Sequence, residues 1–159
     1  SQDTLQDVLF GKNNSITYQV KDSLLARPGI ATGTLIGGNL SVLYSILNSP
    51  SELDWHGKVL FIEDLDEMLY HIDRMMQNLK RSGRLKILAG LIVGGMCDMR
   101  DNSTPFGKTA VEIILEAVDD YAYPVCFHFP AGHIEDNRAL VLGKEVCLDV
   151  SADVTLTYI

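Results

Sequence analysis

Glu63 and His133 are the side chains of this sequence best placed to do chemistry. Glu63 follows an apolar run at residues 59–62, which is typical of a short buried strand. Ligands of open α/β sheets bind just outside the carboxyl ends of strands, so a carboxylate here is well placed for catalysis. A turn residue or the cap of a following helix has the same sequence pattern, and Asp64 and Asp66 compete with Glu63 for these roles.

His133 lies in a bend that follows a second predicted strand. Residues 124–129 form this strand, and Pro130 and Gly132 then turn the chain. Histidine is the commonest general base near neutral pH, although a loop histidine on its own is more often simply solvated. The joint placement of Glu63 and His133 favours a carboxylate that orients an imidazole, as in two members of a hydrolase triad.

The nucleophile that such a pair serves has no candidate in this sequence. The G-x-S-x-G elbow does not occur, and the serines fall in predicted helices, turns and loops. A Cys126–His128 pair is disfavoured because both residues lie along one strand, and a metal site on His128 and His133 has no convincing third ligand. Residues 37–39 are a weak phosphate-loop candidate, and helix capping with tight packing explains them better.

Composition and charge describe one globular domain. The chain has 159 residues, of which 47% are apolar, and a net charge of −8. This charge argues against nucleic acid or an anionic membrane surface as a partner. No apolar run reaches the roughly 20 residues of a membrane span, and the N-terminus has no signal-peptide pattern. The three cysteines form no C-x-x-C pair, so we expect neither disulfides nor zinc, and reducing surroundings fit best.

Hydrophobic periodicity predicts an α/β fold. An apolar stripe that includes Leu69 and Leu79 predicts a helix over residues 66–81, with Asp66 as its cap and Gly83 closing it. Strands and helices alternate in the middle of the chain, which implies a central, mostly parallel sheet with helices packed on it. Additional antiparallel strands are expected from both ends, all in a single domain over residues 1–159. The predicted helices are 40–47, 66–81 and 109–118, and the predicted strands are 15–20, 30–36, 59–62, 87–93, 124–129, 140–142, 145–150 and 154–159.

Five short segments form a specific set along nearly the whole chain. They are GTLIGGNL at 33–40, GKVLFIED at 57–64, IDR at 72–74, Gly132-His133 with Asn137, and LG at 142–143. Together they resemble the C-terminal domain of the LD-carboxypeptidases, the family S66 serine peptidases also known as muramoyltetrapeptide carboxypeptidases. The resemblance extends from about residue 14 to residue 158.

The resemblance implies a fold, a reaction and roles for two residues. The fold is a swivelling β/β/α-type domain, in which Glu63 is the orienting acid and His133 the general base of a Ser-His-Glu triad. The family removes the terminal D-alanine from murein tetrapeptides in cytoplasmic cell-wall recycling, and it uses no metal or cofactor. Its members are commonly dimers, so a homodimer is one expectation for this chain.

The resemblance also implies that the serine lies on an N-terminal domain with no counterpart in this sequence. We therefore expect this chain alone to be inactive as a peptidase. Three alternatives remain open. The chain is a non-catalytic peptide-binding module of the same fold, a relative that cleaves microcin-C-like aminoacyl-nucleotide peptides, or a cysteine hydrolase, which requires an exposed cysteine beside His128 or His133.

Overall fold

A seven-stranded mixed sheet in the order β1-β7-β6-β2-β3-β4-β5 organises the chain in this computed structural model. The structure describes residues 4–6, 14–19 and 26–159, and the predicted end of the first strand at residue 20 lies outside them. The strands are β1 (Ser15–Gln19), β2 (Gly29–Asn39), β3 (Val59–Leu65), β4 (Gly90–Cys97), β5 (Val125–Cys126), β6 (Glu145–Val150) and β7 (Asp153–Tyr158). The helices are α2 (Leu40–Ser45), α3 (Leu69–Arg81), the 3₁₀ turn η2 (Leu85–Ile87) and α4 (Ala110–Ala117).

Strand β2 joins two halves of the sheet. Its residues 29–34 pair antiparallel with β6, and residues 35–39 pair in parallel with β3. Strands β3, β4 and β5 continue the parallel half, whereas β6, β7 and β1 form the antiparallel half. The predicted parallel sheet with antiparallel additions is therefore confirmed.

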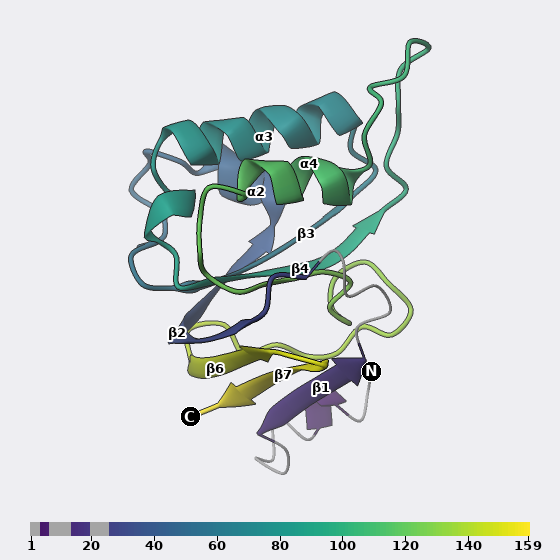
Figure 1. Cartoon of the computed structure of the whole chain (residues 1–159). Helices are drawn as coiled ribbons and strands as arrows, with labels where there is room; N and C mark the ends of the chain where they lie inside the picture. Colours follow the sequence, from purple (N-terminus) through teal and green to yellow (C-terminus); the bar gives the residue numbers. More distant parts are fainter. Residues whose placement is uncertain (1–3, 7–13, 20–25) are drawn as a thin grey trace.

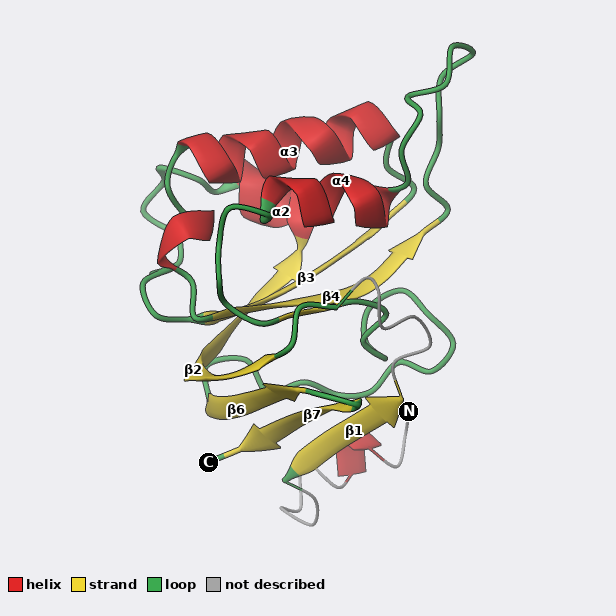
Figure 2. Ribbon diagram, viewed as in Figure 1, coloured by secondary structure: helices red, strands yellow, loops and turns green. Residues whose placement is uncertain are grey.

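The halves are stacked, so the fold has three layers. Helices α2, α3 and α4 cover one face of the parallel strands, and β6, β7 and β1 lie on the other side (Figures 1 and 2). Strand β3 is apolar on both faces for this reason. Its alternation sends Leu60 and Ile62 into the core under the helices, and Val59 and Phe61 into the core against the antiparallel strands. No helix in the described part of the chain is long and apolar enough to cross a membrane.

Two helices begin with side-chain caps. Asn39, predicted as a cap, accepts a hydrogen bond from the Val42 amide at 3.1 Å at the start of α2. Thr109 and Glu112 form a reciprocal capping box at the start of α4. These caps fix where the chain leaves β2 and where it re-enters the helical layer.

The predicted cap of α3 is wrong. Asp66 adopts a left-handed backbone with a φ of 60°, and the helix begins after Met68, which makes no side-chain cap bond. The Leu69 amide instead donates to the carbonyl oxygen of Arg100 at 2.9 Å, so a neighbouring backbone does the work of a cap. Gly83 closes the helix as predicted, with a φ of 80°.

The predicted strand at residues 140–142 is also wrong. Both sides of β2 are already paired, and the outer edges of the sheet belong to β1 and β5. The segment instead turns along β2, where the Gly143 amide donates to the Leu35 carbonyl at 2.8 Å. The predicted strand at 124–129 shortens to β5 because the chain leaves the sheet after Cys126.

Candidate active site

Glu63 and His133 are in direct contact. The Nδ1 atom of His133 lies 2.7 Å from Glu63 Oε2, and the His133 backbone amide donates to the same oxygen at 3.2 Å. The Glu63 side chain is 7% exposed and the His133 side chain 53% exposed. A buried carboxylate thus holds one side of a ring whose other side is open.

Glu63 lies inside strand β3. The sequence had predicted that the strand ends at residue 62, before Glu63. It pairs with Asn39 of β2, and the strand continues to Leu65. On its other side the register with β4 shifts, so that Gly94 and Gly95 together oppose Glu63 alone. This is a β-bulge, and β4 continues through the glycines that the sequence predicted to end it.

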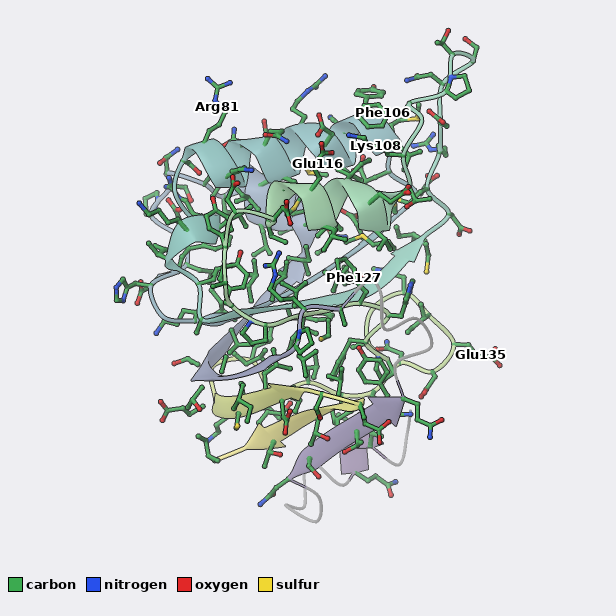
Figure 3. The ribbon with its side chains drawn as sticks, viewed as in Figure 1. Arg81, Phe106, Lys108, Glu116, Phe127 and Glu135 are labelled. Carbon is green, nitrogen blue, oxygen red and sulfur yellow. The ribbon has the colours of Figure 1, made fainter. Side chains whose placement is uncertain are left out.

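The segment that carries His133 attaches to this bulge. The Phe129 amide donates to the Val93 carbonyl at 3.0 Å, and the Gly95 amide donates to the Ala131 carbonyl at 3.0 Å. The segment then turns outward: Phe127 points into the interior, whereas Glu135 points away from the molecule (Figure 3). His133 lies between Phe127 and Glu135 in the sequence, and its ring is half exposed.

The carboxylate sets the protonation chemistry of the ring. The hydrogen bond to Glu63, followed by the charge of Glu63 and the weaker effect of Asp64, raises the pKa of His133 above its ordinary value of 6.5. When the ring is neutral, this contact favours the proton on Nδ1 and leaves the lone pair on Nε2. Among the described residues, Nε2 has no hydrogen-bond partner.

Two of the three cysteines are poor nucleophiles. Cys126 is fully buried, and burial raises the pKa of its thiol to about 12. Burial, with smaller contributions from Asp98 and Glu63, also raises the pKa of Cys97. Thiolates are the reactive form, so this argues against a cysteine hydrolase.

The remaining sequence candidates do not join the pair. His128 is exposed on a left-handed backbone with a φ of 57°, and the described region has no hydrogen bond or ion pair between His128 and His133. In residues 4–6, 14–19 and 26–159, no three His, Cys, Asp or Glu side chains are grouped closely enough to hold a metal ion. Residues 37–39 do cap and pack, since a Cβ on Gly37 would lie 1.8 Å from the Phe61 carbonyl oxygen.

Comparison with known proteins assigns the family. The model of the LD-carboxypeptidase C-terminal domain matches residues 32–148. This chain belongs to the LD-carboxypeptidases. A probable murein peptide carboxypeptidase of Bacillus subtilis is 38% identical over 128 residues, which are 78% of this chain and 39% of that protein.

Solved structures agree with the assignment. The muramoyltetrapeptide carboxypeptidase of Oxalobacter formigenes matches 99% of this chain with a TM-score of 0.86 and 25% identity, over 54% of its own length. The microcin C7 self-immunity protein MccF, whose curated sequence is from Escherichia coli, is solved in complex with aspartyl sulfamoyl adenosine. It matches 91% of this chain and 41% of its own with a TM-score of 0.70 and 25% identity. The chain therefore spans about two fifths to one half of the length of these LD-carboxypeptidase relatives.

Asp64 has a structural role in this LD-carboxypeptidase domain that the sequence pattern did not predict. Asp64, only 1% exposed, points away from His133 toward the helices and accepts hydrogen bonds from Asn39 Nδ2 at 2.8 Å, the Ser41 amide at 2.9 Å and the Leu65 amide at 2.9 Å. It thereby ties the end of β3 to the start of α2, directly beside Glu63. The sequence signal for this role was the helix-cap residue Asn39 after one predicted strand and the adjacent acids Glu63 and Asp64 after the next.

Proposed function

We propose that this chain supplies the acid and base of a Ser-His-Glu carboxypeptidase that removes the terminal D-alanine from murein tetrapeptides. The serine comes from a second domain, and the setting is cytoplasmic recycling of cell-wall peptides. The observation that carries the proposal is the 2.7 Å contact between Glu63 Oε2 and His133 Nδ1. It has the length and the chemistry of the acid–base contact in serine hydrolases.

Each residue has one task in the proposed reaction. His133 Nε2 accepts the proton of the serine hydroxyl as the oxygen attacks the carbonyl carbon, and it returns the proton to the amine of the departing D-alanine. Water then cleaves the acyl-enzyme by the same proton path. Glu63 stays ionised, keeps the ring oriented and stabilises the imidazolium that forms.

The surface beside the pair supports a second domain. Val42, in the first turn of α2, is 57% exposed, and Leu65, two residues after Glu63, is 38% exposed. Exposed apolar side chains near a functional edge suit a surface that another domain covers. We expect the serine-bearing domain to lie over them.

The test joins this chain to the N-terminal part of the Bacillus relative and measures D-alanine release from a murein tetrapeptide. We expect the joined protein to be active and the chain alone to be inactive. His133→Ala and Glu63→Gln should each lower kcat by about 10³-fold or more, because the general base is lost or misoriented.

A matched control is His128→Ala, which removes an exposed histidine from the same segment and should leave kcat unchanged. Near-normal turnover in His133→Ala or Glu63→Gln would remove that residue from the mechanism. D-alanine release by the chain alone, with contaminating peptidases excluded, would contradict the need for a second domain.

The similarity to MccF favours a second candidate substrate, an aminoacyl-nucleotide conjugate. The acid–base pair would serve both substrates equally, since the bond cleaved is an acyl bond in each case. Offering both substrates to the joined protein separates them by kcat/KM. If neither is cleaved and the peptide still binds, the chain is a non-catalytic binding module.

A further inference from the structure

We propose that Gly132 is a positioning residue: its missing side chain lets the backbone close onto Glu63, so that His133 reaches the carboxylate with both its ring and its amide. Its catalytic meaning rests on the proposed function. The placement itself does not, and it can be tested without any activity.

The backbone of Gly132 lies directly against the Glu63 side chain. A Cβ at this position would be 2.9 Å from Glu63 Cβ, 2.9 Å from Oε2 and 3.0 Å from Cγ. Real Cβ atoms essentially never come this close to another heavy atom. Gly132 also has a φ of 107°, which side-chain-bearing residues rarely adopt. Any other residue must therefore push His133 away from Glu63 or push the carboxylate out of place.

Small displacements matter because the hydrogen bond between the His133 amide and Glu63 is already long. The His133 amide already lies 3.2 Å from Oε2, at the long end of the normal range for an N–H···O bond. A shift of a few tenths of an ångström breaks this bond first and then lengthens the 2.7 Å ring contact. The Glu63 backbone cannot follow, because its strand is paired on both sides.

Residues 131–134 are also packed closely against the two glycines of β4. A Cβ on Gly94 would lie 2.5 Å from the Ala131 carbonyl oxygen, and one on Gly95 would lie 2.6 Å from Ile134 Cγ2. The peptide before Gly132 is fixed as well, because its N–H donates to Asn137 Oδ1 at 3.1 Å. The segment is thus confined on several sides, and Gly132 occupies the point where it touches the carboxylate.

The experiment compares Gly132→Ala with Gly107→Ala in this chain. Gly107 has a similarly positive φ of 86° but open space around its missing side chain, so its substitution adds backbone strain without a collision. The readout is the pKa of the His133 ring and its Nδ1/Nε2 tautomer, measured by NMR, with His133→Gln identifying the signal. Thermal unfolding of both variants is recorded in parallel.

We expect wild type and Gly107→Ala to share a His133 pKa above 6.5, and Gly132→Ala to lower it toward 6.5 with loss of the fixed tautomer. An unchanged pKa in Gly132→Ala, or the same decrease in Gly107→Ala, would overturn the proposal. If Gly132→Ala does not fold, Gly94→Ala decides, because its Cβ would lie 2.5 Å from the backbone carbonyl oxygen of Ala131 and displace the same segment. It should lower the His133 pKa, and an unchanged value would refute the idea.

These results are independent of the proposed function. A lowered pKa combined with full turnover of His133→Ala in the joined protein would uphold the positioning and reject the mechanism. An unchanged pKa in Gly132→Ala combined with an inactive His133→Ala would reject the positioning role of Gly132 and uphold the mechanism.

Discussion

Replacing Asp64 by alanine is the sharpest test of how the end of β3 is held. The carboxylate is buried and accepts three hydrogen bonds, two at Oδ1 and one at Oδ2. Alanine removes both acceptor oxygens, and with them all three hydrogen bonds, and leaves the Asn39 amide group and the Ser41 N–H without their partner. Removing one side of a buried, charged hydrogen-bond network typically costs about 3–5 kcal/mol.

The expected loss lies at the lower end of this range. Leu65 is exposed, so water can replace the acceptor at its N–H, whereas Asn39 and Ser41 are partly buried. We therefore expect Asp64→Ala to lower the free energy of unfolding by about 3 kcal/mol, which is about 6–12 °C in Tm for a chain of this size. Asp64→Asn keeps the two bonds at Oδ1, but its amide NH₂ replaces the oxygen that accepts from the Ser41 N–H. Its free energy of unfolding should therefore fall by less, about 1–2 kcal/mol.

Urea and thermal unfolding of wild type, Asp64→Ala and Asp64→Asn measure these losses. Asp119→Ala is the control, because the Asp119 side chain is 83% exposed and lies 3.8 Å from Arg27. A surface pair of this kind contributes about 0–1 kcal/mol. A loss below about 1 kcal/mol in Asp64→Ala, or an equal loss in both Asp64 variants, would refute the reasoning that the three bonds carry this stability.

Three further outcomes follow from the structure. Thr109→Ala removes the capping box with Glu112 and should cost about 1 kcal/mol in urea unfolding, whereas Thr109→Ser should retain most of it. Because Glu63 raises the pKa of His133 in the folded state, their interaction stabilises the chain fully below pH 6.5 and is lost as the pH rises through the folded-state pKa. The Tm difference between wild type and Glu63→Gln should therefore shrink as the pH rises from below 6.5 through the folded-state pKa of His133, and a constant difference would contradict the pairing. Since burial raises the pKa of Cys126 to about 12, this thiol should resist alkylation in the folded chain and react once urea unfolds it, as peptide mass spectrometry can show.

The parts of the structure that the sequence could predict follow simple periodicities. The apolar stripe of α3 buries Ile72, Met76 and Leu79, and β6 has the predicted bounds because its alternation is uninterrupted. The meeting of Glu63 and His133 was also predictable, because the carboxyl ends of parallel strands lie at one edge of a sheet. The order of strands and helices placed both residues at that edge, but it left Asp64 and Asp66 as competitors of Glu63.

Local competition between hydrogen-bond partners was not predictable. Asp66 has the residue type of a helix cap. The first turn of α3 is instead capped by the carbonyl oxygen of Arg100, which is distant in sequence, and Asp66 adopts a left-handed backbone. Glycines were misinterpreted in a similar way. Gly94 and Gly95 look like the end of a strand, and only the approach of residues 131–134 shows that they form a bulge within it.

The bulge also explains why the contact between Glu63 and His133 does not depend on the rest of the sheet edge. Glu63 is fixed by its strand between β2 and β4, and the segment with His133 is hydrogen-bonded to β4 at Val93 and Gly95. Both partners therefore belong to one hydrogen-bonded unit, and their 2.7 Å separation is set within this domain. A covering domain would add the nucleophile without having to build the base. In the proposed function, this means that a preference between murein peptides and aminoacyl-nucleotides would come from side chains other than Glu63 and His133.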